Sequence, residues 1–496
     1  MSEESAAPDQ AQKDIQALAK GGRTNFFGFL LRLAARLPFL FIAGRLYGAE
    51  SLGRFALALV VVELSAQLCT LGQKRGLAMR LSKEQEHPAN TVADAMLLGG
   101  SLAVVATAII YLLPDIMFNG AYTEAERLVV LSILPLTLTE IALAAQAYRF
   151  DIATSVRSRA LVEPWTLSIL SGVLYFVYRE AGLLIAYNLS VLAAAITALW
   201  PMFRTYGLPR QWKPKPLEIG QLALVNLPLA AADAIEWGTR RFDIYLLGFF
   251  AGDKAVGIYY VAQQIASVPQ KLKTSFEPIL GPVITRNLKE KNFEAIAKQV
   301  CQVGFWITAA QAGVALALGI PGEGVMGLVG PMFVGGTAAL CFLLAAEVSA
   351  ATAVVSEAVL IYVRRMQNLW VSLATLFMQA AATIGLIKLV ESFGLNDNYK
   401  AAMAGAGLMV ALAMASWVKS RLLARFLGQS VNNWRWPLVW AAAPAVVIGW
   451  AATRFLPEWA ELSLGIPAIL LAYGFVIWHK GFGPEDRVLF RRNVGG

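Results

Sequence analysis

The sequence is poor in charged residues and nearly lacks histidine and cysteine. Of its 496 residues only 15% are charged and 57% are hydrophobic, with a mean hydropathy of +0.57. Water-soluble domains carry about 25% charged residues, so a set of soluble domains is excluded. Two histidines and three cysteines without CxxC spacing favour neither a metal site nor a disulfide framework. No Gly-x-x-x-x-Gly-Lys-Ser/Thr phosphate-binding loop is present, which argues against a nucleotide-driven engine. We therefore expect a membrane protein without a bound cofactor.

Long apolar segments recur along most of the chain. A span needs about 20 mainly apolar residues to cross roughly 30 Å of hydrocarbon. The sequence predicts an all-α, polytopic membrane protein with about fourteen such segments. They are 26–46, 52–71, 92–113, 128–148, 160–178, 182–203, 219–250, 256–285, 300–320, 337–361, 367–390, 401–418, 437–455 and 462–479.

The positive charges between these segments predict an orientation. With the N terminus inside, the internal segments hold 28 of the 42 Lys and Arg residues and the external loops hold five. Cytoplasmic loops carry such an excess, so the sequence predicts that both termini lie in the cytoplasm. The net charge of +9 is then explained by topology and not by nucleic-acid binding.

A short glycine pattern occurs twice, 204 positions apart. Gly44, Gly48 and Gly53 align with Gly248, Gly252 and Gly257, and Arg36 aligns with Arg240. Both copies begin inside, so the repeat is parallel. Glycines spaced by four allow close helix contact. We expect a cytoplasmic N-terminal tail (1–24), a first six-helix bundle (25–203), a cytoplasmic linker (204–218), a second six-helix bundle (219–418), a cytoplasmic loop (419–436), two extra transmembrane helices (437–479) and a cytoplasmic C-terminal tail (480–496).

Ionisable residues lie inside several predicted spans, where each costs at least about 2.5–3.5 kcal/mol at mid-bilayer. In the seventh span four ionisable residues follow helical spacing, namely Asp233, Glu236, Arg240 and Asp243. They form one polar stripe along the helix, and this stripe cannot face lipid. Cations in a cavity favour an anion, and the guanidinium fork of arginine suits phosphate. The candidate substrate-binding residues are Arg32, Arg36, Arg240, Arg241, Lys271 and Lys273. The candidates for ion coupling or structural ion pairing are Glu63, Asp233, Glu236, Asp243, Glu277 and Glu347.

A structural interpretation stands beside the functional one for these charges. Ion pairing within a bundle would explain Asp233, Glu236 and Arg240 without any ligand. For Lys271 and Arg36, pairing and ligand binding are evenly balanced. Otherwise the excess of cations over acids on these spans points to a phosphate-bearing cargo.

The run from Gly44 to Ala56, followed by an apolar span and the basic loop Gln73-Lys-Arg-Gly, resembles the opening of polysaccharide and oligosaccharide flippases. These belong to the multidrug/oligosaccharidyl-lipid/polysaccharide exporter superfamily. The second copy, from Asp243 to Arg286, is similar to the start of their second half. The likeness covers most of the chain, from about 25 to 479.

This resemblance implies movement of an undecaprenyl-diphosphate-linked oligosaccharide from the inner to the outer leaflet of a bacterial inner membrane. The two bundles would rock around a cationic chamber, with the diphosphate between Arg36 and Arg240 and the polyprenyl tail in lipid. Coupling to protons or sodium is implied. Expected partners are the lipid-linked sugar, membrane lipids, and the polymerase and export machinery of exopolysaccharide, capsule or O-antigen assembly. We expect a monomer.

Alternatives remain at this point. One is a cation-coupled multidrug antiporter of the same superfamily, and another is a flippase for the peptidoglycan precursor. From a different class, a membrane polysaccharide polymerase or ligase would need a long external loop, and the predicted external loops are short. A purely structural scaffold would not need charged residues within spans of both repeats.

Overall fold

The computed structural model describes residues 37–82, 87–118, 120–149, 151–274, 284–484 and 486–487, without the side chains of 152 and 271–274. Every regular element within these ranges is a helix. The α-helices are α2 (Gly48–Cys69), α3 (Gln73–Leu81), α4 (Pro88–Leu112), α5 (Glu124–Arg127), α6 (Ile133–Tyr148), α7 (Ile152–Ser155), α8 (Glu163–Val177), α9 (Gly182–Tyr206), α10 (Pro216–Phe250), α11 (Asp253–Thr274), α13 (Phe293–Gly319), α14 (Gly322–Val329), α15 (Thr337–Val363), α16 (Arg365–Ser392), α17 (Asp397–Leu427), α18 (Pro437–Phe455), α19 (Glu458–Ala460) and α20 (Ile466–Val476). π-helical segments include η1 (Ala43–Tyr47), η4 (Val156–Val162), η6 (Glu461–Gly465) and η7 (Ile477–Gly481).

The predicted all-helical, polytopic membrane fold is confirmed. Eleven helical stretches among the described residues are long and apolar enough to cross a membrane. The first predicted segment lies mostly outside the described residues. Helices α10 and α11 occupy the positions of the seventh and eighth, and α10 carries several charges that interrupt its apolar character.

The chain forms two compact units, and each is described by itself. The N-terminal unit comprises the described residues up to Tyr260, and the C-terminal unit comprises the described residues from Val261 onward. Helix α11 begins in the first unit and continues in the second. The limits of the two repeat bundles proposed from the sequence are a different division and stay a prediction.

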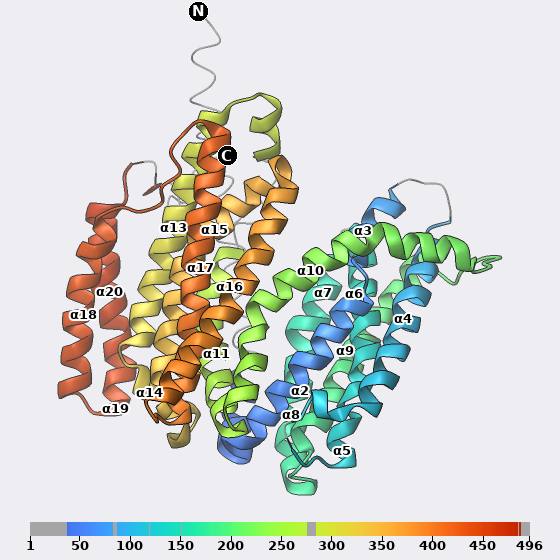
Figure 1. The fold of residues 1–496 in the computed structure, drawn as a ribbon, viewed down its shortest axis with the longest axis horizontal. Helices are drawn as coiled ribbons and strands as arrows, with labels where there is room; N and C mark the ends of the chain where they lie inside the picture. The colour runs from blue at the N-terminus through green and yellow to red at the C-terminus, as the bar shows by residue number, and fades with distance from the viewer. Residues whose placement is uncertain are drawn as a thin grey trace, which may run out of the picture. The chain divides into compact units, whose positions relative to one another are not determined.

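The N-terminal unit packs α2 against α10, and α6 against α4 and α9 (Figure 1). The chain turns between α2 and α3 at Leu71 and Gly72, whose φ angles are 47° and 66°. A Cβ on Gly72 would lie 2.6 Å from the Cβ of Leu229. Glycine is therefore required here both for the left-handed backbone and for the close approach of α10.

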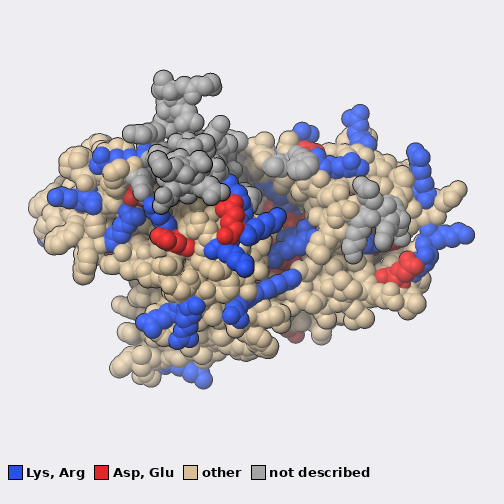
Figure 2. Space-filling view, turned by 90° about the horizontal axis from the view of Figure 1, so that it is seen from above, with Lys and Arg blue, Asp and Glu red and all other residues tan. Residues whose placement is uncertain are grey.

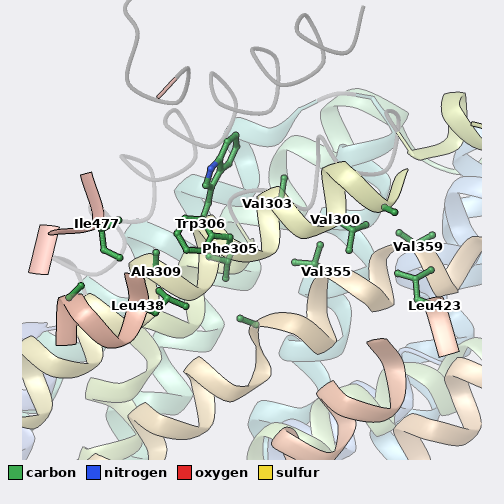
Figure 3. Close-up of a cluster of buried hydrophobic side chains, with 14 of the residues drawn as sticks. Val300, Val303, Phe305, Trp306, Ala309, Val355, Val359, Leu423, Leu438 and Ile477 are labelled. Carbon is green, nitrogen blue, oxygen red and sulfur yellow. The ribbon is translucent and has the colours of Figure 1, made fainter. Parts of the chain in front are cut away.

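The C-terminal unit is built around α13, α15 and α17, with α16 packed on α17. Figure 3 shows its core, in which Phe305 and Trp306 of α13 lie among aliphatic side chains from neighbouring helices. Helices α18 and α20 pack on one another and on α13 (Figure 1). Buried apolar side chains therefore stabilise this unit.

A buried carboxylate fixes the end of the described chain to this core. Asp486 is 2% exposed and accepts hydrogen bonds from Gln302 Nε2 at 3.1 Å and Trp306 Nε1 at 2.9 Å. Arg435 Nη1 donates to it at 2.7 Å, and the Gly483 amide donates at 3.0 Å. A buried charge is tolerated only when it is paired and hydrogen-bonded, and Asp486 meets both conditions.

Candidate functional site

The predicted polar stripe lies on a single helix, α10, in the N-terminal unit. Asp233 and Asp243 are buried, Glu236 is exposed, and Arg240 and Arg241 are half-buried. Because Arg240 and Arg241 are adjacent, their side chains leave the helix about 100° apart. The two arginines therefore have different surroundings, although the sequence treats them as a pair.

Arg75 of α3 binds the N-terminal part of this stripe. Its Nη2 lies 3.3 Å from Asp233 Oδ1 and 3.3 Å from Glu236 Oε2. The backbone of α3 lies against the Asn226 side chain of α10, since a Cβ on Gly76 would lie 2.6 Å from its Oδ1. For Asp233 and Glu236 the structure thus shows ion pairing within the unit, which supports the structural interpretation of these two residues.

A second group of charges lies beside α3, and we call it the internal cluster: Lys74, Glu140, Arg159 and Glu163. Arg159 of η4 donates to Glu140 of α6 and to Glu163, four residues ahead of it. Lys74 Nζ lies 2.8 Å from Glu140 Oε2. Glu140, Arg159 and Glu163 are partly buried and Lys74 is exposed, and the four charges sum to zero. Four charges that satisfy one another explain how the bundle tolerates them.

Arg241 faces the interior of the N-terminal unit. It interacts electrostatically with Glu63 of α2, with Asp243, and with the phenols of Tyr187 and Tyr260. Both tyrosines are buried, and the rings of both pack edge-on against Phe55. Glu63 and Asp243 balance the positive charge of Arg241.

Asp243 has a different environment. It is fully buried and accepts hydrogen bonds from the hydroxyl of Tyr259 on α11 and from the Ile244 amide at 3.0 Å. This contact joins α10 to α11 in the first part of the second repeat.

The remaining candidates lie outside the described residues or in the C-terminal unit. Arg32, Arg36 and Glu277, and the side chains of Lys271 and Lys273, lie outside the described residues. Glu347 is buried in α15 of the C-terminal unit. Their assigned roles stay predictions.

Sequence reasoning missed Lys74 and Arg75 as ion-pairing residues, as well as Arg159 and Glu163. Lys74, Arg75 and Arg159 fall between the predicted spans, in internal loops. The available signal was the four-residue spacing of Arg159 and Glu163, which is the spacing of a helical ion pair. No pattern within one helix shows that Arg75 pairs with acids more than 150 positions later.

The family of the chain follows from a comparison with protein-family models. The model described as "Polysaccharide biosynthesis protein" matches residues 28–318. The chain belongs to this family. The match includes α2–α11 and therefore every charged group described above in the N-terminal unit. No curated protein matches the chain.

Solved structures show the fold. The chain is similar to an inward-facing multidrug resistance MATE family transporter of the MOP superfamily, with a TM-score of 0.65 and 15% identity over 83% of this chain and 99% of that one. The outward-facing form of such a transporter gives 0.58, with 16% identity over 84% and 97%. A MOP superfamily transporter from Pyrococcus furiosus, whose title reports reverse polarity of its binding pocket, gives 0.58 with 16% identity over 84% and 96%. The polysaccharide biosynthesis protein therefore has the fold of MOP-superfamily membrane transporters.

Proposed function

We propose that the protein is a flippase that moves undecaprenyl-diphosphate-linked oligosaccharide from the inner to the outer leaflet of a bacterial inner membrane. Family membership over residues 28–318 carries the proposal. The transporter fold supplies a framework for alternating access, and no enzymatic step is invoked.

The charges of α10 support a phosphate-bearing substrate. Arg240 follows Glu236 by one helical turn on the polar stripe and is half-buried. A guanidinium can bind two phosphate oxygens at once. In this proposal Arg240 binds the diphosphate together with Arg36, its equivalent in the first repeat. Arg241 holds α10, and with it the stripe, in position through its interaction with Glu63 of α2. The polyprenyl tail stays in lipid.

The distribution of charge supports the N-in, C-in orientation. Figure 2 shows the molecule from above, and among the described residues visible there Lys and Arg predominate over Asp and Glu. A surface of this kind is typical of the cytoplasmic side. The sugar unit would accordingly enter from the side of α3.

Complementation tests the function. In a strain that lacks its polysaccharide flippase, the native chain should restore surface polymer. Arg240→Ala should abolish restoration at matched membrane levels, whereas Arg454→Ala, at an exposed position in the last turn of α18, should not. Restoration by Arg240→Ala would remove the residue from the proposal. Failure of the native chain across hosts with different sugars would contradict the function.

A second candidate is a drug antiporter, because the similar solved structures include multidrug resistance transporters. Drug efflux from cells expressing the chain, without any polymer phenotype, would favour this candidate. The proposed flippase predicts polymer restoration and no change in drug resistance.

A further inference from the structure

Helices α2 and α11 cross at a point where no side chain separates them. A Cβ on Gly53 would lie 1.7 Å from the carbonyl oxygen of Asp253. A Cβ on Gly257 would lie 1.8 Å from the carbonyl oxygen of Ala49. Ordinary van der Waals contact of a Cβ begins at 3.4 Å, so neither position accepts even a methyl group unless the helices separate.

The contact is reciprocal in terms of the repeat. Gly53 and Gly257 are equivalent positions, 204 residues apart, and so are Ala49 and Asp253. Gly53 of the first copy therefore packs on the Asp253 oxygen of the second copy, and Gly257 of the second copy packs on the Ala49 oxygen of the first. This is the pattern of a two-fold contact, in which i touches j and j touches i.

A single ion pair breaks the symmetry. Arg54 Nη1 lies 3.7 Å from Asp253 Oδ2 across the crossing. Arg54 also donates to Glu126 at 2.9 and 3.0 Å and to the Ala121 carbonyl at 2.8 Å, which ties α2 to the segment around α5. The positions equivalent to Arg54 and Asp253 are Ile258 and Ala49, so the other copy has no counterpart pair.

The crossing lies at one end of the unit and away from the internal cluster. It involves the first two turns of α2, whereas Lys74 and Arg75 follow its last residue, Cys69. With 1.5 Å per residue, the 22 residues of α2 extend about 33 Å. The predicted topology places the crossing at the external surface. Glycine contacts bury little apolar area, so separating them costs less than separating interlocked side chains.

We propose that the Gly53–Gly257 crossing is an external latch between the two repeats, closed by backbone contact and separated in each transport cycle. The proposal rests on the proposed function, because alternating access requires the repeats to part at their external ends. A permanent packing contact is the alternative, and it predicts that the crossing never opens.

Thiol labelling tests the latch without any substrate. Cys69, Cys301 and Cys341 are replaced by serine, and Ala49→Cys is introduced, since Ala49 is 2% exposed and lies in the contact. Intact cells are treated with a membrane-impermeant maleimide, and Lys254→Cys, at an exposed position one residue beyond Asp253, gives the reference rate. Ala49→Cys should react measurably but at least tenfold more slowly than Lys254→Cys.

A methyl group added at the crossing should then shift the equilibrium from the closed to the open latch, and we call such substitutions wedge variants. Gly257→Ala should raise the labelling rate of Ala49→Cys at least tenfold, and Gly53→Ala should reproduce the effect because the contact is reciprocal. Gly172→Ala is the matched control, because a Cβ on Gly172 meets nothing within 4 Å, and it should leave the rate unchanged. Unaltered labelling in both wedge variants would overturn the latch.

Two results on the glycine-intact chain also overturn it, should the wedge variants fail to reach the membrane. One is labelling of Ala49→Cys as fast as Lys254→Cys, which means that no contact protects it. The other is complete protection over hours, which means a permanent contact. Polymer restoration is scored in parallel. Loss of polymer by the native chain with the expected labelling pattern would contradict the flippase function and leave the latch standing.

Discussion

Removing the carboxylate of Asp486 should release the C-terminal segment from the C-terminal unit. The side chain accepts bonds from Gln302, Trp306 and Arg435 and lies almost wholly out of solvent. Asp486→Ala leaves the buried Gln302 and Trp306 donors without this acceptor, and Arg435 without its counter-ion. Breaking a buried ion pair costs about 3–5 kcal/mol, and one partner here, Arg435, has a side chain that is 36% exposed. We therefore expect a loss near the lower limit, about 3 kcal/mol.

A loss of about 3 kcal/mol corresponds to an opening equilibrium roughly 100-fold more favourable. Trypsin cleavage after Lys480 and Arg487, measured in detergent below saturating protease, should accelerate by about that factor. Asp486→Asn keeps an oxygen acceptor of the same size and should lose less. Equal cleavage of native chain and Asp486→Ala would refute the role of the buried carboxylate.

Three further predictions concern the N-terminal unit. Arg75→Ala should lower stability by about 1–2 kcal/mol, because it leaves the buried Asp233 without its partner; a second change, Asp233→Asn, should restore part of the thermal midpoint, and no rescue would refute the pairing. Asp243→Asn keeps a hydrogen-bond partner for Tyr259 but removes the charge, so coupled transport should fail at normal membrane level, and normal transport would exclude coupling at this residue. Burial raises the pKa of Asp253, an effect opposed by Arg54 and reinforced by Glu50 and Glu126. The latched state therefore binds a proton at Asp253 more tightly than an open state in which the pKa is the ordinary value of about 4. Lowering the pH should consequently favour the latched state and slow labelling of Ala49→Cys. That protection should be lost as the pH rises through the raised pKa, and Asp253→Asn should remove the pH dependence.

The helical architecture could be predicted because apolar length and helical spacing are properties of single segments. The stripe from Asp233 to Asp243 follows helical spacing in the sequence and lies on one helix in the structure. The sequence repeat pairs Gly53 with Gly257, and these two glycines lie at one helix crossing in the structure; the repeat itself stays a prediction.

Pairing between helices could not be predicted in the same way. Arg75 follows α2 in a segment with the composition of a polar loop, yet it binds acids on α10. Arg159 falls in a predicted internal loop, but in the structure it forms ion pairs with Glu140 and Glu163. Such assignments depend on which helices are neighbours, and neither hydropathy nor spacing within one helix contains that information.

The central claim is that the protein moves a lipid-linked diphosphate sugar past Arg240. The most direct measurement uses purified chain in proteoliposomes that contain a fluorescent polyprenyl-diphosphate-linked oligosaccharide, with external dithionite quenching as the readout. The native chain and Arg454→Ala should expose the inner-leaflet lipid, and Arg240→Ala should slow this at least tenfold. Equal rates for native and protein-free vesicles, with several sugars tested, would contradict the claim.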